Sequence, residues 1–162
     1  MPVQDYNINT PDNSVGTLYG LQHTRADIQT GFLTSEANFG DAVQHDGTVE
    51  RGYKVAPVVA GKVAGIVMRN DMKEANARPS TGSVTLLPKD SAPIVKDGAI
   101  NVRILEAGAY KAGGFASVLD TDGTFGITVA GGRKATVNVT FVTSGIAVAG
   151  DIVPVNITHG KQ

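Results

Sequence analysis

Residues 115–157 read FASVLDTDGTFGITVAGGRKATVNVTFVTSGIAVAGDIVPVNI. Apolar and polar side chains alternate in two parts of this stretch. The apolar positions of these two runs are Val137, Val139 and Phe141, then Val153, Val155 and Ile157. A period of two residues is typical of a strand with one buried face. This part of the chain therefore predicts a β structure.

Turn signals separate the predicted strands. Asp122-Gly123 lies between two apolar runs and predicts a hairpin with a type I′ turn. Ser144-Gly145 marks a second break. Because Pro154 has no N–H to donate to a ladder, we expect the last strand to lie at a sheet edge or to begin there.

The middle of the chain adds more strands. Residues 82–87 (GSVTLL) and 99–105 (AINVRIL) both read as strands, and Asp97-Gly98 is expected to form the turn before the second. In that strand, one face is predicted to carry the apolar side chains and the other Asn101 and Arg103; the apolar set is Ile100, Val102 and Ile104. Residues 70–80 (NDMKEANARPS) are the best helical candidate, limited to one or two turns by Pro79.

Strands spaced by about 8–12 residues, with turns between them, are typical of a sandwich or barrel. The 20 glycines among 162 residues also favour many tight turns. The sequence thus predicts a mostly β fold: a single compact β-sandwich or barrel-like domain over residues 17–162. At most short helices accompany it, and an extended N-terminal arm precedes it over residues 1–16.

The expected arm, residues 2–16 (PVQDYNINTPDNSVG), is polar and interrupted by proline. It is too polar to build a core, yet it contains four apolar side chains that could lie on a partner protein: Val3, Tyr6, Ile8 and Val15. These four are the predicted partner-binding residues. The alternative is a frayed terminus.

Composition and charge narrow the function classes. The absence of cysteine rules out disulfides and thiolate chemistry, and no segment has the ~20 continuous apolar residues of a membrane helix. Residues 1–10 lack a secretion signal, so we expect a cytoplasmic origin.

The charge is unevenly distributed along the chain. Residues 1–50 carry a net charge of −6 and residues 51–162 carry +5. Either this separation is chance, or the first third docks on a basic surface of this chain or a neighbour. The thin spread of bases argues against nucleic-acid binding.

No motif indicates catalysis or a cofactor. The histidines, His23, His45 and His159, lack the spacing of a helical zinc pair. Asp120-Thr-Asp122-Gly123 begins like a calcium loop but lacks the closing Glu. We therefore expect no enzyme activity, no metal, no cofactor and no small-molecule substrate. The alternative is a small hydrolase or sugar-binding protein whose site is assembled in space around His23 or His45 and a carboxylate.

Residues 27–157 resemble the structural cement, or capsid decoration, proteins of tailed bacteriophages. The resemblance rests on DIQTGFLTSEANFGDAV, GTVERGYKVAP and GKVAGIVMRND, then on three later segments: Asp97–Val102, Gly114–Val118 and Asn138–Ile157. It implies a mostly β virion protein that binds the outer surface of the major capsid protein lattice and stabilises the head. It also implies a homo-oligomer, dimer or trimer, made in the bacterial host cytoplasm. The alternative is another virion or adhesive β-module, such as a tail tube or host-binding protein.

Overall fold

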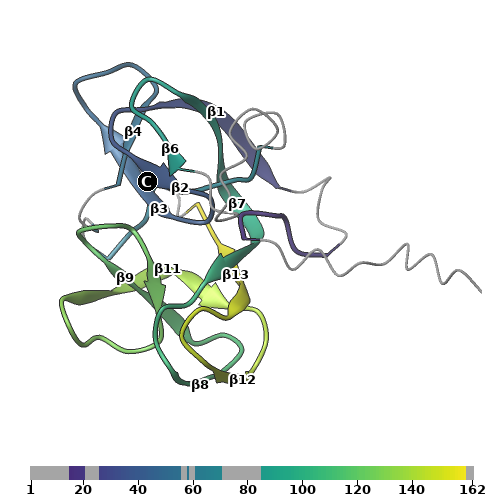
Figure 1. Ribbon diagram of the computed structural model, residues 1–162. Coiled ribbons are helices and arrows are strands. Elements are labelled where there is room, and N and C mark those ends of the chain that lie inside the picture. The colour runs from purple at the N-terminus through teal and green to yellow at the C-terminus, as the bar shows by residue number, and fades with distance from the viewer. Residues whose placement is uncertain (1–14, 21–25, 56–57, 59–60, 71–84, 160–162) are drawn as a thin grey trace, which may run out of the picture.

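The computed structural model describes residues 15–20, 26–55, 58, 61–70 and 85–159. These residues form thirteen strands and no helix, so none of them forms a helix that could cross a membrane. Apart from Asn70, the predicted helix at 70–80 lies outside the described residues. The mostly β fold is therefore confirmed (Figure 1).

The strands in chain order are β1 (Asp27–Leu33), β2 (Ala37–Asn38), β3 (Ala42–Asp46), β4 (Gly52–Lys54), β5 (Gly65–Val67), β6 (Thr85–Leu86), β7 (Ser91–Arg103), β8 (Gly108–Tyr110), β9 (Phe115–Leu119), β10 (Phe125–Gly126), β11 (Arg133–Phe141), β12 (Gly145–Ala147) and β13 (Ile152–Ile157). Of the predicted strand at 82–87, residues 82–84 lie outside the described residues and Thr85–Leu86 form β6. The predicted strand at 99–105 is the second half of β7.

The first half of the fold is a closed five-stranded barrel. Its order is β1-β4-β3-β5-β7, and pairing of β1 with β7 closes the ring. One pair in it, β1 with β4, is parallel. The ring of Tyr53 lies directly under Gly31, where an added Cβ would overlap it. Gly31 thus lets a large aromatic side chain fill the barrel beside its aliphatic neighbours. The barrel core comprises Leu33, Ala37, Val43, Tyr53, Val67, Leu86, Ala92 and Ile94.

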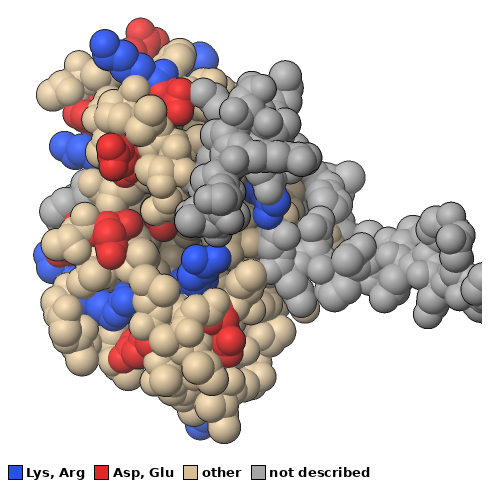
Figure 2. All heavy atoms as spheres, viewed as in Figure 1, with Lys and Arg blue, Asp and Glu red and all other residues tan. Residues whose placement is uncertain are grey.

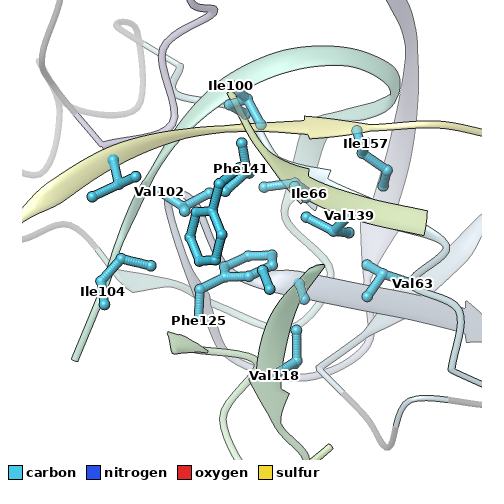
Figure 3. Close-up of a cluster of buried hydrophobic side chains, with 14 of the residues drawn as sticks. Val63, Ile66, Ile100, Val102, Ile104, Val118, Phe125, Val139, Phe141 and Ile157 are labelled. Atoms are coloured by element: carbon cyan, nitrogen blue, oxygen red, sulfur yellow. The ribbon is translucent and has the colours of Figure 1, made fainter. Parts of the chain in front are cut away.

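The second half is a curved sheet in the order β7-β13-β11-β9-β10. It bends back on itself, because a bridge joins Phe125 of β10 to Ile104, just beyond β7. The inward side chains form the larger core (Figure 3), which includes Ile100, Val102, Val118, Phe125, Val139, Phe141 and Ile157. Phe125 is fully buried at its centre. The alternation predicted for the last strand is confirmed, because Val153, Val155 and Ile157 are buried. In β11 it is wrong at Val137, which is 56% exposed, because the register with β9 shifts between Ala135 and Thr140.

Strand β7 belongs to both halves, and the turn predicted at Asp97-Gly98 is wrong. Residues 91–97 pair with β1, whereas residues 98–103 pair with β13. Gly98 has a φ of 133°, a conformation that side chains rarely adopt, and the register with β1 shifts at Asp27. A glycine bulge lets a strand bend without ending. The result is one 13-residue strand where the sequence suggested a turn and a shorter strand.

The last strand is not at an edge, so that expectation for Pro154 is also wrong. β13 lies between β7 and β11. Val142 N–H donates to the Pro154 carbonyl at 3.0 Å, but proline cannot return the second bond of the pair. The β11 ladder starts at the next residue, with Val155 opposite Phe141. The missing donor thus falls just outside the ladder, which is why an interior strand tolerates this proline.

The predicted hairpin at Asp122-Gly123 is confirmed, but the type I′ turn is wrong, because Asp122 lacks the positive φ that such a turn requires at both central residues. The loop is also longer than two residues. β9 pairs with β10 around residues 120–124. Asp122 Oδ1 accepts the Thr124 N–H at 2.9 Å, and Gly123 has a φ of 69°. The Gly123 carbonyl accepts the Ala42 N–H at 2.8 Å, so the loop docks on the start of β3.

Candidate functional site

The predicted partner-binding residues divide into two groups. Val3, Tyr6 and Ile8 lie outside the described residues. Val15 is half-buried, and its Cγ1 would lie 2.5 Å from a Cβ placed on Gly40. Since Gly40 also has a φ of 83°, it leaves room for Val15 that another residue would fill. Val15 therefore packs on its own domain.

The chain from Gly16 to Tyr19 runs beside the second half of β7, on the edge opposite β13. Gly16 N–H donates to the Asn101 carbonyl and Asn101 N–H donates to the Thr17 carbonyl, both at 2.8 Å. Tyr19 N–H donates to the Ala99 carbonyl at 2.9 Å, and Leu18 forms an antiparallel bridge with Ile100. The point at which the N-terminal residues join the domain is thus fixed by main-chain hydrogen bonds.

Asn101 shows how this segment changes the second sheet. Its side chain lies on the face opposite Ile100 and Val102, as the alternation predicts, but it is buried rather than exposed. Its Nδ2 donates to Thr17 Oγ1 at 3.1 Å. Arg103, two residues further on the same face, stays exposed. The polar side of β7 is therefore used to hold the N-terminal segment.

Exposed apolar side chains gather at the end of the second sheet that carries β8 and β12. Ile146 is 82% exposed, Val148 63% and Phe115 56%. We call the whole set the β12 patch: Leu105, Phe115, Val142, Ile146, Val148 and Ile152. Large apolar groups exposed together commonly mark a protein–protein contact.

The sheet register shows that part of this patch is one continuous face. Phe115 is paired with Thr140, and Val142 lies two residues further on the same face of β11. Val142 lies opposite Pro154, and Ile152 follows on that face of β13. The neighbouring residues on the inner face, such as Phe141 and Val155, are buried. Thr140, Asn156 and exposed Arg103 lie on the same outer face, so exposed apolar and polar side chains share it.

The other members of the patch lie on the segments that follow β7 and β11 in the chain. Val142 and Ile152 bracket that loop, which carries Ile146 and Val148. Ile104 N–H donates to the Asp151 carbonyl at 2.8 Å, which brings Leu105 beside the start of β13. In β12 itself Ala147 is buried in the core. The small side chain of this strand is therefore inside, and the large ones beside it, Ile146 and Val148, are outside.

Charge is sparse at this end of the molecule. Residues 141–150 (FVTSGIAVAG) contain no charged side chain. Figure 2 shows acidic and basic groups interspersed on the drawn face, with fewer of them toward the β8–β12 end. Elsewhere, one acid of the first third pairs within the chain, since Asp46 Oδ1 lies 4.0 Å from Lys54 Nζ. In this pair one acidic residue from residues 1–50 lies near one basic residue from residues 51–162.

The described residues offer no cluster typical of catalysis or metal binding. They contain no group of three or more His, Asp or Glu side chains placed to hold a metal. The His45 ring lies 4.8 Å from the Tyr53 ring. Partial burial and repulsion from Lys96 and His159 lower the pKa of His45. A catalytic histidine is normally oriented by a carboxylate, whereas the groups that act on His45 are aromatic or cationic. His23 lies outside the described residues.

Among the carboxylates in the described part of the chain, Asp41 has the titration most strongly altered by burial. It lies between β2 and β3, and its Oδ2 accepts the Asn38 N–H at 2.7 Å and Asn38 Nδ2 at 3.3 Å. Burial raises the pKa of Asp41 to about 7, and the negative charge of Asp122 adds to this rise. Its contacts are those of a loop between strands, so they indicate a structural role.

The described residues thus form a closed barrel and a curved sheet that share β7, with large apolar side chains exposed at the β8–β12 end. This fold is shared with a chain from "The capsid of Myoviridae Phage XM1", with a TM-score of 0.66, 15% identity, and coverage of 90% of this chain and 89% of that chain. The family model described as "Structural cement protein (E217 gp24/Pam3 gp6)" matches residues 1–158. The chain therefore belongs to the phage structural cement protein family. A search of curated proteins gave no match.

Proposed function

We propose that this protein binds the outer surface of the major capsid protein lattice and stabilises the assembled head. The observation that carries the proposal is the family match over residues 1–158. The shared fold with a phage capsid chain and the exposed β12 patch support it. In this role the protein is made in the bacterial host cytoplasm, forms a homo-oligomer, and needs neither nucleic acid nor a small-molecule substrate.

The N-terminal residues are proposed to extend the contact with the capsid. Fourteen residues precede Val15 and can span at most roughly 45–50 Å. Burial of Val3, Tyr6 and Ile8 on a partner would contribute about 1.5–3 kcal/mol for each side chain. Ordering the backbone costs about 1–2 kcal/mol per residue, so only a closely matched surface can hold the segment. This requirement favours one specific partner.

The structure sets where a truncation should end. Deletion of residues 2–14 keeps Val15 and the hydrogen bonds of Gly16 to Asn101 and Arg69. A deletion that also removed residues 15 and 16 would expose Gly40 and remove these bonds. The shorter deletion therefore tests partner binding with the domain preserved.

The assay is co-sedimentation of the purified protein with capsids that lack it, over a range of concentrations. We expect full-length protein to saturate the capsids at a fixed ratio, and the 2–14 deletion to bind at least tenfold more weakly. The deletion should unfold at the same denaturant concentration as the full chain. Failure of the full chain to bind capsids would contradict the proposed function; equal binding of both proteins would contradict only the role of the N-terminal residues.

A further inference from the structure

We propose that one end of the barrel binds a carboxylate group. The site consists of Lys96, His45 and His159, and we call it the Lys96 site. It goes beyond the proposed function, because that proposal gives the barrel no ligand. The carboxylate belongs either to an acidic side chain of a partner protein or to a small acid in solution. Both present the same chemical group to the site.

Two strands place Lys96 and His45 at the same end of the barrel. β3 and β7 both run antiparallel to β5, so their last residues lie at the same end. Lys96 follows Ile94 of the barrel core by two residues, and His45 follows core residue 43 by two, so strand alternation directs both side chains inward. Lys96 Nζ lies 5.9 Å from the centre of the Tyr53 ring, and the centre of the His45 ring lies 4.8 Å from it. Both side chains therefore meet at one aromatic ring.

A β-bulge contributes to the position of Lys96. Residues 27 and 28 are consecutive in β1 but lie opposite residues 97 and 95 of β7. Lys96 is therefore the extra residue of the bulge. Bulges re-aim side chains and are common beside active sites. The ladder thus gives up one pairing at the residue whose ammonium lies over Tyr53.

The Lys96 ammonium is buried without a counter-charge. Lys96 is 8% exposed, and within the described part of the chain it forms no hydrogen bond or ion pair. Its Nζ still reaches solvent, because Ser117 Oγ is the sole fully buried side-chain nitrogen or oxygen without a hydrogen-bond partner among the described residues. A buried charge without a partner carries a free-energy penalty, which an incoming anion would reduce.

Two histidines complete the site. His159 N–H donates to Asp97 Oδ2 at 3.3 Å, and because Asp97 is the residue after Lys96, His159 lies at the same end of the barrel. Partial burial, then repulsion from Lys96 and His159, lowers the pKa of His45. At neutral pH the His45 ring is therefore uncharged, and one ring N–H can donate to an anion. Both histidines are exposed, so a ligand can approach from solvent.

The charge of the site favours a carboxylate over a phosphate. Lys96 supplies one full positive charge, whereas His45 offers a hydrogen bond without a charge at pH 7. A carboxylate has a single negative charge, so one ammonium neutralises it. A phosphate dianion would retain negative charge at a partly buried position, near the carboxylate of Asp97, which is unfavourable.

Nuclear magnetic resonance of the histidine ring protons tests the site. The probe is sodium acetate, the reference is sodium chloride at equal ionic strength, and His45→Gln assigns the signals. A carboxylate bound beside Lys96 offsets its repulsion and attracts the imidazolium form of His45. We therefore expect saturating acetate to raise the pKa of His45 by about one unit and Lys96→Met to abolish this response. Lys111→Met, which removes an exposed lysine just after β8, should respond like wild type.

Two results would overturn the proposal. One is an equal pKa of His45 in acetate and in chloride, and the other is an acetate response that persists in Lys96→Met. Far-UV circular dichroism establishes that the variants are folded. The comparison of acetate with chloride uses the wild type, so it decides the matter even if Lys96→Met does not fold.

Co-sedimentation with capsids identifies the source of the carboxylate. If it is an acidic side chain of a capsid protein, Lys96→Met should bind capsids at least tenfold more weakly than Lys111→Met, and sodium acetate should compete better than sodium chloride. If both variants bind capsids equally and acetate still raises the pKa of His45, the ligand is a small acid in solution. The acetate experiment uses no capsids, so its failure leaves the proposed function standing.

Discussion

Replacement of Asp41 with asparagine should make the protein more stable at pH 8 and remove most of a pH dependence between pH 4 and 7. In the folded protein the buried Asp41 carboxyl has a pKa of about 7, against 3.8 for the unperturbed group. The folded state therefore keeps a proton that the unfolded chain releases above pH 4. Stability from this group is fully present below pH 4 and is lost as the pH rises toward 7.

The size of the effect follows from the pKa difference. About three pKa units, at about 1.4 kcal/mol for each, correspond to about 4 kcal/mol lost between pH 4 and 7. The asparagine side chain of the Asp41→Asn variant keeps an oxygen that can accept the Asn38 N–H, which bonds Asp41 Oδ2 at 2.7 Å in the native protein. This side chain carries no charge at any pH. We therefore expect the variant to gain most of this free energy at pH 8 and little at pH 4.

Urea unfolding at pH 4.5, 6, 7 and 8 measures this effect as the difference between wild type and variant. Taking the difference cancels the opposite contribution of His45, whose lowered pKa makes stability rise with pH. Asp46→Asn is the control. Hydrogen bonds from Thr34 and Thr48 lower the pKa of Asp46 to about 2, so its contribution is lost only below pH 4. A pH-independent difference between Asp41→Asn and wild type would refute the reasoning.

Two further predictions concern stability. Phe125→Ala should lower the free energy of unfolding by about 3–5 kcal/mol, because its ring is fully buried in the larger core, whereas Phe115→Ala should have little effect because that ring is 56% exposed. Gly123→Ala should cost at least about 1–3 kcal/mol, since Gly123 has a φ of 69° and an added Cβ would lie 2.5 Å from the Ala42 carbonyl oxygen. Gly47→Ala should stay within about 0.5 kcal/mol of wild type, because a Cβ there meets open space. Denaturant unfolding with far-UV circular dichroism measures all four variants, and a Gly47→Ala loss equal to that of Gly123→Ala would contradict the steric argument.

The parts of the fold that could be predicted are those with a local signal. Alternation at Val153, Val155 and Ile157 identifies the buried face of β13, and Asp122-Gly123 identifies the hairpin between β9 and β10. In β11 the same signal holds for Val139 and Phe141 but not for Val137, which is exposed. The pairing of β1 with β4 and β7, which closes the barrel, joins residues far apart in the chain and leaves no periodic mark. The sequence therefore predicts strands in a barrel or sandwich but does not order them.

Glycine and proline misled the prediction where tertiary contacts decide their role. Gly98 follows an aspartate as in a turn, but pairing on both sides of β7 keeps that strand continuous through it. Pro154 has no backbone N–H in any fold, but the free-energy cost depends on whether the β-ladder requires a hydrogen bond from that position. The β11 ladder starts one residue later. Neither outcome can be inferred from the dipeptides alone.

The candidate contact surface was missed for a related reason. The alternation in GIAVAG predicts a strand with one face buried and leaves open which face it is. Tertiary packing places Ala147 in the core and leaves Ile146 and Val148 outside. The lack of charge from residue 141 to 150 was the available signal, because the outer face of an ordinary surface strand is polar.

The second half of β7 connects the N-terminal segment to the second sheet. On one edge it holds Gly16–Tyr19, near the start of the described chain, and on the other it pairs with β13, whose outer face belongs to the β12 patch. The N-terminal segment and β13 are therefore joined through main-chain hydrogen bonds on the two edges of one strand. The five-stranded barrel shares β7 and adds a second core behind it. Because both edges of this part of β7 are paired, the point at which the N-terminal residues join the domain and the second sheet form one hydrogen-bonded unit.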